Sequence, residues 1–357
     1  MMTIYGATLE TDPLYDDEQR DYDALLFMSF GGPEGMDEVI PFLERVTKGR
    51  NVPRERLEQV AEHYYHFDGV SPINGQNREL IAALEDEFKT NEMNIPIYFG
   101  NRNSEPFITD TIEQMKTDGI DRAAAFVTAG FSCYSGCRQY RENIIKALDE
   151  VGDQAPEIDK LRMFYNHPGF ITAQADRVKD ALANFDTDEV HLIFTAHSIP
   201  LGMADNSDYV VQLEESCRLV AEQVGTENYT LAYQSRSGPP FIPWLEPDIL
   251  DYMDSLPAKG IDNIIIVPIG FISDHMEVLF DLDIEAVEKA EELNINMVRA
   301  ATVGTHPEFV KMIRLLVEER MEASPQRLAI GNRPANHDIC PVGCCQQGAK
   351  RPARARE

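Results

Sequence analysis

The sequence of 357 residues predicts an α/β protein with two halves, each a four-stranded parallel sheet flanked by helices. Three observations support this fold class: eight short apolar runs rich in branched residues, amphipathic stretches between most of them, and a polar connection, EVGDQAPEIDK, midway along the chain. A single closed barrel is the alternative, but the midway connection favours two open Rossmann-like halves.

Each apolar run has the length of a strand that is buried on both faces. We expect strands at residues 23–30, 95–100, 122–128, 160–165, 190–195, 229–235, 263–269 and 296–300. Stretches such as QNRELIAALEDEFKTN, SGCRQYRENIIKALDE and QADRVKDALANF repeat apolar residues at helical spacing, so we expect them to cover the sheets. Ligands of open α/β sheets bind beyond the carboxyl ends of the strands, which directs the search for chemistry to the loops that follow them.

The pattern divides the chain into an acidic N-terminal tail, 1–20, a first half, 21–155, and a second half, 156–306. A helix at 307–322 is expected to complete the first half. The remaining tail, 323–357, is rich in turn formers and lacks periodicity, so it needs another source of order. Its basic ending, AKRPARARE, is expected to be flexible.

The formal net charge of −29 repels nucleic-acid phosphates and anionic lipid surfaces, so we expect no nucleic-acid partner. No apolar run approaches the roughly 20 residues that cross a bilayer. The first residues are acidic where a secretory signal is basic and then apolar. We therefore expect a cytoplasmic protein without stable membrane insertion.

In the reducing cytoplasm, the six cysteines are expected to be metal ligands or ordinary thiols. Three of them lie in the C-terminal tail: Cys340, Cys344 and Cys345. Cys133 and Cys137 share one mid-chain loop. Cys217 lies within a helical pattern and is expected to be a small buried apolar residue.

Polar residues gather where strands of the second half end. His197 follows the apolar run HLIFT, although a lone histidine there is more often a structural hydrogen-bonding group. After the strand in IIIVPIGF, a helix carries Glu277, Asp281 and Glu285 every four residues, in one row about 6 Å apart per step. A solvated helix face is the alternative for the last two. Histidine with carboxylates suits a ferrous ion that is held weakly enough to be passed on.

Five strings, LLFMSFGGPEG, HFDGVSPINGQ, FTAHSIP, YQSRSGPPFIPWLEPDI and GFISDHMEVLFDLDIEA, occur in the order found in ferrochelatases. From about residue 22 to 320, the chain therefore resembles this family, and most of all its actinobacterial members that act on coproporphyrin III and carry a C-terminal 2Fe-2S cluster. The resemblance implies a chelatase-like fold and a lyase of haem biosynthesis that inserts ferrous iron into a porphyrin and releases two protons.

The resemblance also implies roles for site residues. His197 and Glu277 would face each other across the porphyrin plane as the catalytic pair and metal site, with Asp281 and Glu285 delivering iron to Glu277. We assign the displaced pyrrole protons to His197, since a neutral imidazole accepts a proton near pH 7. Four residues would contact the porphyrin by stacking or by hydrogen bonds to its propionates: His63, Tyr64, Ser71 and Tyr140.

In some ferrochelatases, one mid-chain cysteine and three tail cysteines bind the 2Fe-2S cluster, and closing the tail onto a distant loop would order it. The resemblance assigns the tail ligands as Cys340, Cys344 and Cys345. It favours Cys137 as the fourth ligand, whereas a match to the human type would favour Cys133. A zinc site with the same thiolates is the alternative.

The stretch ERVTKGRNVPRERLEQ is polar and basic where membrane-bound ferrochelatases have an apolar lip. Its cations are Lys48, Arg50, Arg54 and Arg56. They favour coproporphyrin III, which has four propionates, over protoporphyrin IX, which has two, although a solvated helix face explains these cations equally well. Where soluble bacterial relatives place an axial tyrosine, this chain has Glu34, which we expect to cap the following helix.

Two other functions are compatible with the sequence. A chelatase for a different tetrapyrrole would have the same two-lobed fold, but the string SDHMEVL argues against it. A haem carrier would use His197 as an axial ligand without turnover. Expected partners are the porphyrin and ferrous iron, with transient contacts to other enzymes of the haem pathway.

Overall fold

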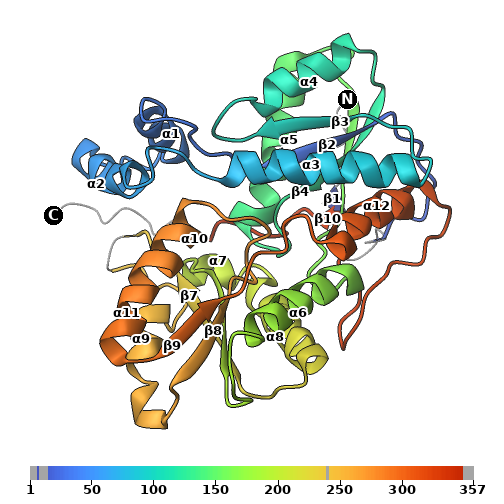
Figure 1. The fold of residues 1–357 in the computed structure, drawn as a ribbon. Helices are drawn as coiled ribbons and strands as arrows, with labels where there is room; N and C mark the ends of the chain where they lie inside the picture. The colour runs from blue at the N-terminus through green and yellow to red at the C-terminus, as the bar shows by residue number, and fades with distance from the viewer. Residues whose placement is uncertain (1–5, 8–14, 239–240, 349–357) are drawn as a thin grey trace.

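The computed structural model describes residues 6–7, 15–238 and 241–348 and contains two four-stranded parallel sheets (Figure 1). Their strand orders are β3-β2-β4-β5 and β7-β6-β8-β9. The prediction of two open sheets flanked by helices, rather than one barrel, is thus confirmed. Each order places consecutive strands on both sides of the first strand, so the carboxyl ends of neighbouring strands meet at one edge.

The first sheet consists of β2 (Ala24–Ser29), β3 (Ile97–Asn101), β4 (Arg122–Val127) and β5 (Glu157–Lys160). The strand expected at 160–165 was misplaced, because β5 lies in the polar connection and pairs with β4 from Glu157 to Lys160. The apolar run that follows β5 is buried without forming a strand, because its side chains pack in the core between the sheets. The first sheet therefore extends past the boundary placed at 155.

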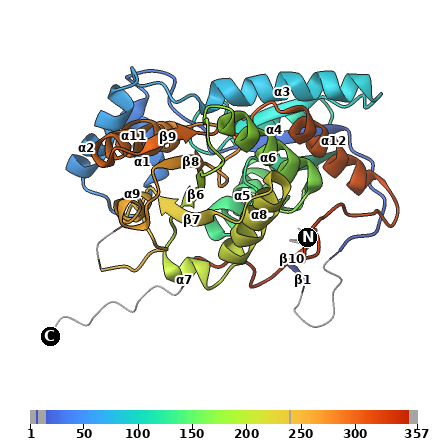
Figure 2. The same cartoon turned by 60° about the horizontal axis from the view of Figure 1, so that its bottom comes forward.

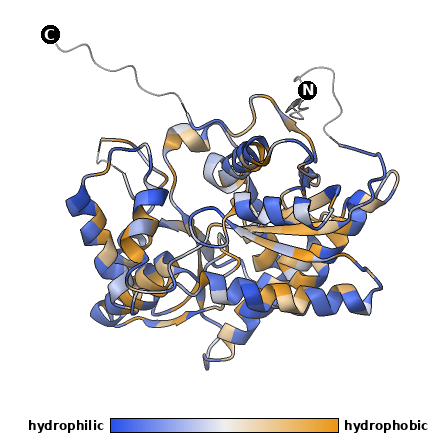
Figure 3. Cartoon of the chain, turned by 90° about the horizontal axis from the view of Figure 1, so that it is seen from above, coloured by the Kyte–Doolittle hydropathy of each residue, from blue (hydrophilic) through white to orange (hydrophobic). Residues whose placement is uncertain are grey.

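Helices α3 (Ile73–Thr90), α4 (Ile108–Thr117) and α5 (Gln139–Val151) cover the faces of this sheet, whereas α1 (Val39–Val46) and α2 (Arg54–Tyr65) pack on each other as a separate hairpin. The long helix α3 buries Leu80, Leu84 and Phe88, which recur every four residues and so share one face. On the opposite face, Ile112 of α4 and Ile144 of α5 pack in a second cluster. Coloured by hydropathy, the strands are largely orange, while blue dominates the outward helix faces (Figure 3).

The second sheet consists of β6 (His191–His197), β7 (Tyr229–Gln234), β8 (Asn263–Val267) and β9 (Asn296–Arg299). Its helices and helical turns are α6 (Pro168–Leu182), α7 (Leu201–Ala204), α8 (Tyr209–Val224), α9 (Ile249–Asp254), η2 (Pro257–Lys259), α10 (Met276–Phe280), η3 (Asp281–Glu285) and α11 (Ala286–Leu293). Cys217 of α8 is fully buried in the apolar core, where it was expected.

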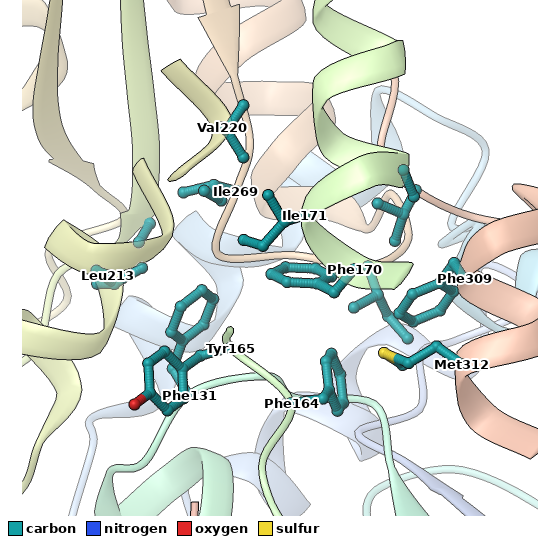
Figure 4. Packing of buried hydrophobic residues seen from close by; sticks show 14 of the residues in the cluster. Phe131, Phe164, Tyr165, Phe170, Ile171, Leu213, Val220, Ile269, Phe309 and Met312 are labelled. Carbon is teal, nitrogen blue, oxygen red and sulfur yellow. The ribbon is translucent and has the colours of Figure 1, made fainter. Parts of the chain in front are cut away.

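Helix α12 (Pro307–Met321) packs against both α3 and α6 and so joins the two halves. The ring of Phe309 of α12 lies 5.7 Å from that of Phe164 and 6.2 Å from that of Phe170 (Figure 4). It also lies 6.5 Å from the ring of Phe126 on β4. Burying each such ring contributes about 1.5–3 kcal/mol, so this shared cluster fixes the two sheets relative to each other.

The C-terminal segment is tied down by side chains and by a short strand pair. Strand β10 (Cys340–Pro341) pairs in parallel with β1 (Gly6–Ala7). Asp338, which is buried beside it, pairs with Arg327 at 2.6 Å. The tail is therefore ordered up to residue 348, and the basic ending 349–357 lies outside the described residues. Among the described helices, none has the length and apolar character needed to span a bilayer.

Candidate active site

The predicted catalytic pair lies at the carboxyl end of the second sheet. His197 is the last residue of β6, and Glu277 lies in the first turn of α10, after β8. His197 Nε2 is 3.7 Å from Glu277 Oε2, and the two side chains are 30% and 47% exposed. The structure thus brings together two residues 80 positions apart in the sequence, at an edge that solvent can reach.

Hydrogen bonds orient the imidazole of His197. Its Nδ1 is bonded to the carbonyl oxygen of Ser198, which requires a proton on Nδ1 and leaves Nε2 facing Glu277. The Tyr209 hydroxyl donates to the His197 carbonyl at 3.0 Å. Burial lowers the pKa of His197, but the charge and hydrogen bond of Glu277 raise it more, so the net pKa is raised. The same pairing outweighs burial at Glu277 and lowers its carboxyl pKa, so this carboxylate stays ionised.

A second histidine supports Glu277. His275 Nδ1 accepts a hydrogen bond from the Glu277 amide at 3.2 Å and caps α10. Burial lowers the pKa of His275, which matches an uncharged ring whose Nδ1 lone pair accepts the amide proton. The sequence signal for this role is its position two residues before Glu277, just ahead of the helix.

Asp281 lies beside the pair but is held by different partners. Its Oδ2 accepts hydrogen bonds from the Ser235 hydroxyl and, at 3.5 Å, from Gln234 Nε2. The same amide group donates to the Glu277 carbonyl at 3.2 Å. Burial, opposed by the Ser235 bond, and the charge of Glu277 together raise the pKa of Asp281 to about 7. Asp281 can therefore gain or lose a proton near neutral pH.

The three acids expected in one row lie on a continuous helical segment, but not on a regular α-helix, because residues 281–285 form the π-helical turn η3 between α10 and α11. Besides burial, the charges of Glu277 and Glu285 both raise the pKa of Asp281, which lies between them in the sequence. Glu285 is exposed, and its pKa is raised by burial and by the nearby carboxylates of Asp248 and Glu288. These acids extend the negative charge outward from the pair.

The α1–α2 hairpin flanks this site (Figures 1 and 2). Its core includes Met276, the neighbour of Glu277. His63 stacks on Phe280 of α10, with ring centroids 3.7 Å apart. Tyr64, by contrast, is buried in the hairpin core, 5.9 Å from the ring of Phe42. Tyr64 shares that core with Met276 of α10, and the charge of Glu277 adds to burial in raising the pKa of its hydroxyl, so both candidate porphyrin contacts lie next to α10.

The other two predicted porphyrin contacts belong to the first half and are buried. Ser71 packs so close to Gly32 that a Cβ there would lie 2.6 Å from the Ser71 Cβ. Tyr140 lies beneath Arg102, whose guanidinium is 4.7 Å from the ring centre. The guanidinium of Arg102 is also 5.5 Å from the ring centre of Phe30, which directly follows β2 and is 37% exposed. Sequence reasoning missed Phe30, although it directly follows a strand.

The two halves meet beside the active site. Gln76 of α3 accepts from the Asp274 amide at 2.7 Å and donates to the Asp274 carboxylate at 3.3 Å. Glu34 was expected to cap a helix, but α1 begins only at Val39. Glu34 instead forms a two-pronged ion pair with Arg78 of α3, in which Nη2 is 2.8 Å from Oε2. The sequence could not show this partner because it lies 44 positions away.

Four of the five cysteines considered as ligands gather between the first half and the tail. Cys137, in the π-helical turn η1 (Tyr134–Arg138), packs with Cys340 and Cys344. The sulfurs of Cys344 and Cys345 are 3.5 Å apart, and hydrogen bonding with Cys340, partly offset by hydrogen bonding with Cys345, raises the pKa of the Cys137 thiol. The described cysteines are all free thiols.

The remaining mid-chain candidate, Cys133, lies in the main apolar core, and its sulfur accepts from the Gly136 amide at 3.2 Å. A histidine that sequence reasoning missed joins the tail group instead. The possible ligand atoms of His337, Cys340 and Cys344 all lie within 4.8 Å of one another. The sequence signal for His337 is its position three residues before Cys340.

Solved structures with a similar fold define the class of protein. SirB of Bacillus subtilis with Fe3+ superposes with a TM-score of 0.54 at 15% identity, covering 84% of this chain and 96% of that one. A Deinococcus radiodurans protein described as similar to chelatases superposes with a TM-score of 0.52 at 13% identity, covering 86% and 58%. The fold is therefore that of the chelatases.

The family is more specific. The family model named Ferrochelatase matches residues 22–321. The chain is 57% identical over 334 residues to the ferrochelatase of Rhodopirellula baltica, covering 93% of this chain and 95% of that one. It is 48% identical over 361 residues to the coproporphyrin III ferrochelatase of Streptomyces coelicolor, covering 94% and 96%. The chain belongs to the ferrochelatase family, lyases that insert iron into a porphyrin.

Proposed function

We propose that this ferrochelatase inserts ferrous iron into coproporphyrin III, with His197 and Glu277 as the metal-handling pair. The observation that carries the assignment of the pair is the 3.7 Å approach of Nε2 to Oε2 at the carboxyl end of the second sheet. The exposed ring of Phe30 follows β2 at the corresponding end of the first sheet. A flat macrocycle held between these two edges would meet the pair with its centre.

The charges of the pair suggest an order of events. Without iron, His197 is favoured in its protonated form by Glu277, which stays negative. A ferrous ion arriving at Glu277 replaces the imidazolium as counter-charge and drives its proton to the solvent that reaches the 30% exposed ring. The neutral Nε2 then accepts the two pyrrole protons one after the other, as general base, and passes each to solvent. Asp281, with a pKa of about 7, offers a carboxylate that passes iron or a proton without holding either tightly.

Cations without carboxylate partners support the choice of coproporphyrin III. Arg54 is already paired with Glu44 at 2.7 Å and Glu58 at 3.0 Å, so it is a poor candidate for a propionate. In the described part of the chain, Arg102 and Arg56 form no ion pair: the first donates to the Ser135 carbonyl and the second to Gln59. Four propionates engage more such cations than two do.

The named relatives point the same way. Besides the Streptomyces coelicolor protein, one from Mycolicibacterium smegmatis named coproporphyrin III ferrochelatase is 48% identical over 319 residues. Protoporphyrin IX remains the competing substrate, because the Rhodopirellula baltica relative carries only the broader name.

We further propose that Cys137, Cys340, Cys344 and Cys345 hold a 2Fe-2S cluster. The fit rests on four neighbouring thiols, three of them buried, with no disulfide among the described cysteines. When bound, such a cluster supplies one-electron redox chemistry and crosslinks the tail to the first half. Arg138 already holds the tail by donating to the Cys344 carbonyl at 3.1 Å. Iron and sulfide analysis distinguishes the cluster from zinc.

Steady-state insertion of ferrous iron under anaerobic conditions tests the substrate. We expect a higher kcat/KM for coproporphyrin III than for protoporphyrin IX. Arg102→Met should reduce this ratio, while Arg54→Met, the matched control whose charge is already neutralised, should leave it unchanged. A preference for protoporphyrin IX would contradict the substrate assignment and leave the family assignment intact.

A further inference from the structure

One histidine and two cysteines of the tail converge on one point. The possible ligand atoms of His337, Cys340 and Cys344 all lie within 4.8 Å of one another. Among the described residues, these three form the one group of histidines, cysteines and acids whose ligand atoms lie so close together. His337 does not belong to the proposed cluster ligands, and Cys345 does not belong to this group. The two ligand sets therefore overlap but differ.

The spacing of these atoms is close to the spacing around a single metal ion. A tetrahedral ion with bonds of about 2.0 Å to nitrogen and 2.3 Å to sulfur holds its ligand atoms roughly 3.5–3.8 Å apart. His337 Nε2 is 3.8 Å from Cys344 Sγ. The other two distances are at most 4.8 Å, so each must shorten by no more than about 1.3 Å when an ion binds. Small side-chain rotations supply a movement of this size.

The backbone next to each of the three residues is anchored. Asn336 is buried and donates to the His337 carbonyl at 3.3 Å. Cys340 belongs to β10, which pairs with β1. Arg138 of η1 donates to the Cys344 carbonyl at 3.1 Å. Because these contacts already order the chain, less conformational entropy is lost when an ion binds.

The chemistry of the three side chains limits which ion they can bind. Two thiolates and an imidazole suit a borderline divalent transition-metal ion, whereas magnesium and calcium require oxygen ligands. The ion replaces one proton on each of the two thiols, and both protons leave to solvent. Three protein ligands leave the fourth tetrahedral position to water. His337 and Cys344 are only half-buried, so an ion can reach them from solvent.

We propose that His337, Cys340 and Cys344 bind one divalent transition-metal ion when the cluster is not in place. Because Cys340 and Cys344 belong to both ligand sets, the single ion and the cluster exclude each other. His337 serves only the ion, and Cys345 serves only the cluster. The ion site shares two thiols with the proposed cluster but does not require that cluster to form.

Titration with Co2+ tests the proposal on the full-length protein, after a chelator has removed bound iron under anaerobic, reducing conditions. Charge-transfer absorption from thiolate to cobalt reports only ions that sulfur binds, so an ion at His197 and Glu277 does not contribute. We expect one such ion per chain. His337→Ala should weaken its binding at least about tenfold, since even residues that only support metal ligands contribute this much to affinity. Cys345→Ser and the control His66→Ala, which changes an exposed histidine, should bind Co2+ like the unmodified protein.

Two further measurements keep the outcome clear. Thermal unfolding shows whether each variant is folded, and His337→Gln, which keeps a polar side chain but offers a poor ligand, replaces His337→Ala if that variant is not. Equal Co2+ affinity in the unmodified protein and in the folded His337 variant would overturn the proposal. So would a loss of affinity in Cys345→Ser as large as that in His337→Ala, because the cluster thiols would then hold the ion.

Iron and sulfide analysis of the proteins as purified separates this proposal from that of the cluster. His337→Ala should keep both elements, whereas Cys345→Ser should lose them. Loss of iron and sulfide from the folded His337→Ala variant would overturn the separate role of His337. If the unmodified protein contains neither element, the cluster assignment fails, and the Co2+ titration still tests the ion site.

Discussion

Replacing Asp281 by Asn should stabilise the protein at alkaline pH while impairing catalysis. The pKa of Asp281 is raised from 3.8 to about 7, so the unfolded chain releases this proton more readily than the folded one. Stability contributed by this group is therefore present below pH 3.8 and lost as pH rises to 7. With 1.36 kcal/mol for each pKa unit, the loss reaches about 4 kcal/mol above pH 7.

Asn keeps an oxygen that accepts from Ser235 but cannot ionise, so the variant escapes this loss. Urea unfolding at pH 4 and pH 8 should show nearly equal free energies of unfolding at pH 4 and an advantage for Asp281→Asn of up to about 4 kcal/mol at pH 8. The exposed carboxylate of Glu288 on α11 supplies the control variant Glu288→Gln, for which no such gain is expected. The reasoning would be refuted if the stability advantage of Asp281→Asn over the unmodified protein were no larger at pH 8 than at pH 4.

Three further predictions concern stability and the tail. Burial lowers the pKa of His167 to about 3, so only the unfolded chain takes up this proton as pH falls below 6.5, and the folded protein loses stability. His167→Asn can still cap α6, and urea unfolding at pH 5 should show that it avoids about 2 kcal/mol of this loss. Arg162→Met leaves the buried Glu319 without its partner at 2.6 Å and should lower the free energy of unfolding by about 3–5 kcal/mol, whereas an unchanged value would contradict the role of the pair. Cys340→Ser should abolish bound iron and sulfide while Cys133→Ser retains them, and the reverse pattern would exclude the proposed ligand set.

The fold could be predicted from local patterns because each buried strand carries its own apolar signal. Strand β6 illustrates this, since the run HLIFT is buried over its whole length. Strand β5 shows where the pattern fails: three of its four residues, Glu157–Lys160, are charged and it pairs only at an edge, while the apolar residues after it pack in the core without pairing in the sheet. The apolar pattern of a sequence indicates which residues are buried, but at an edge strand the residues that pair in the sheet need not be the buried ones.

The site was less predictable because its geometry depends on distant contacts. His197 and Glu277 could be singled out from their positions after strands and from the resemblance to ferrochelatases. The π-helical turn that carries Asp281 and Glu285 could not be predicted, because a spacing of four residues is equally compatible with a regular α-helix. The partner of Glu34 and the place of His337 beside the cysteines likewise arise from chain segments that meet only in the folded protein.

The central claim is that His197 and Glu277 together carry out metal insertion. The most direct test is the anaerobic rate of ferrous insertion into coproporphyrin III for the unmodified protein, His197→Ala and Glu277→Ala, with porphyrin binding measured alongside by fluorescence quenching. We expect both variants to bind the porphyrin and to lose insertion by at least a hundredfold, in line with the usual contribution of a general base. Insertion at the unmodified rate in either variant would contradict the claim.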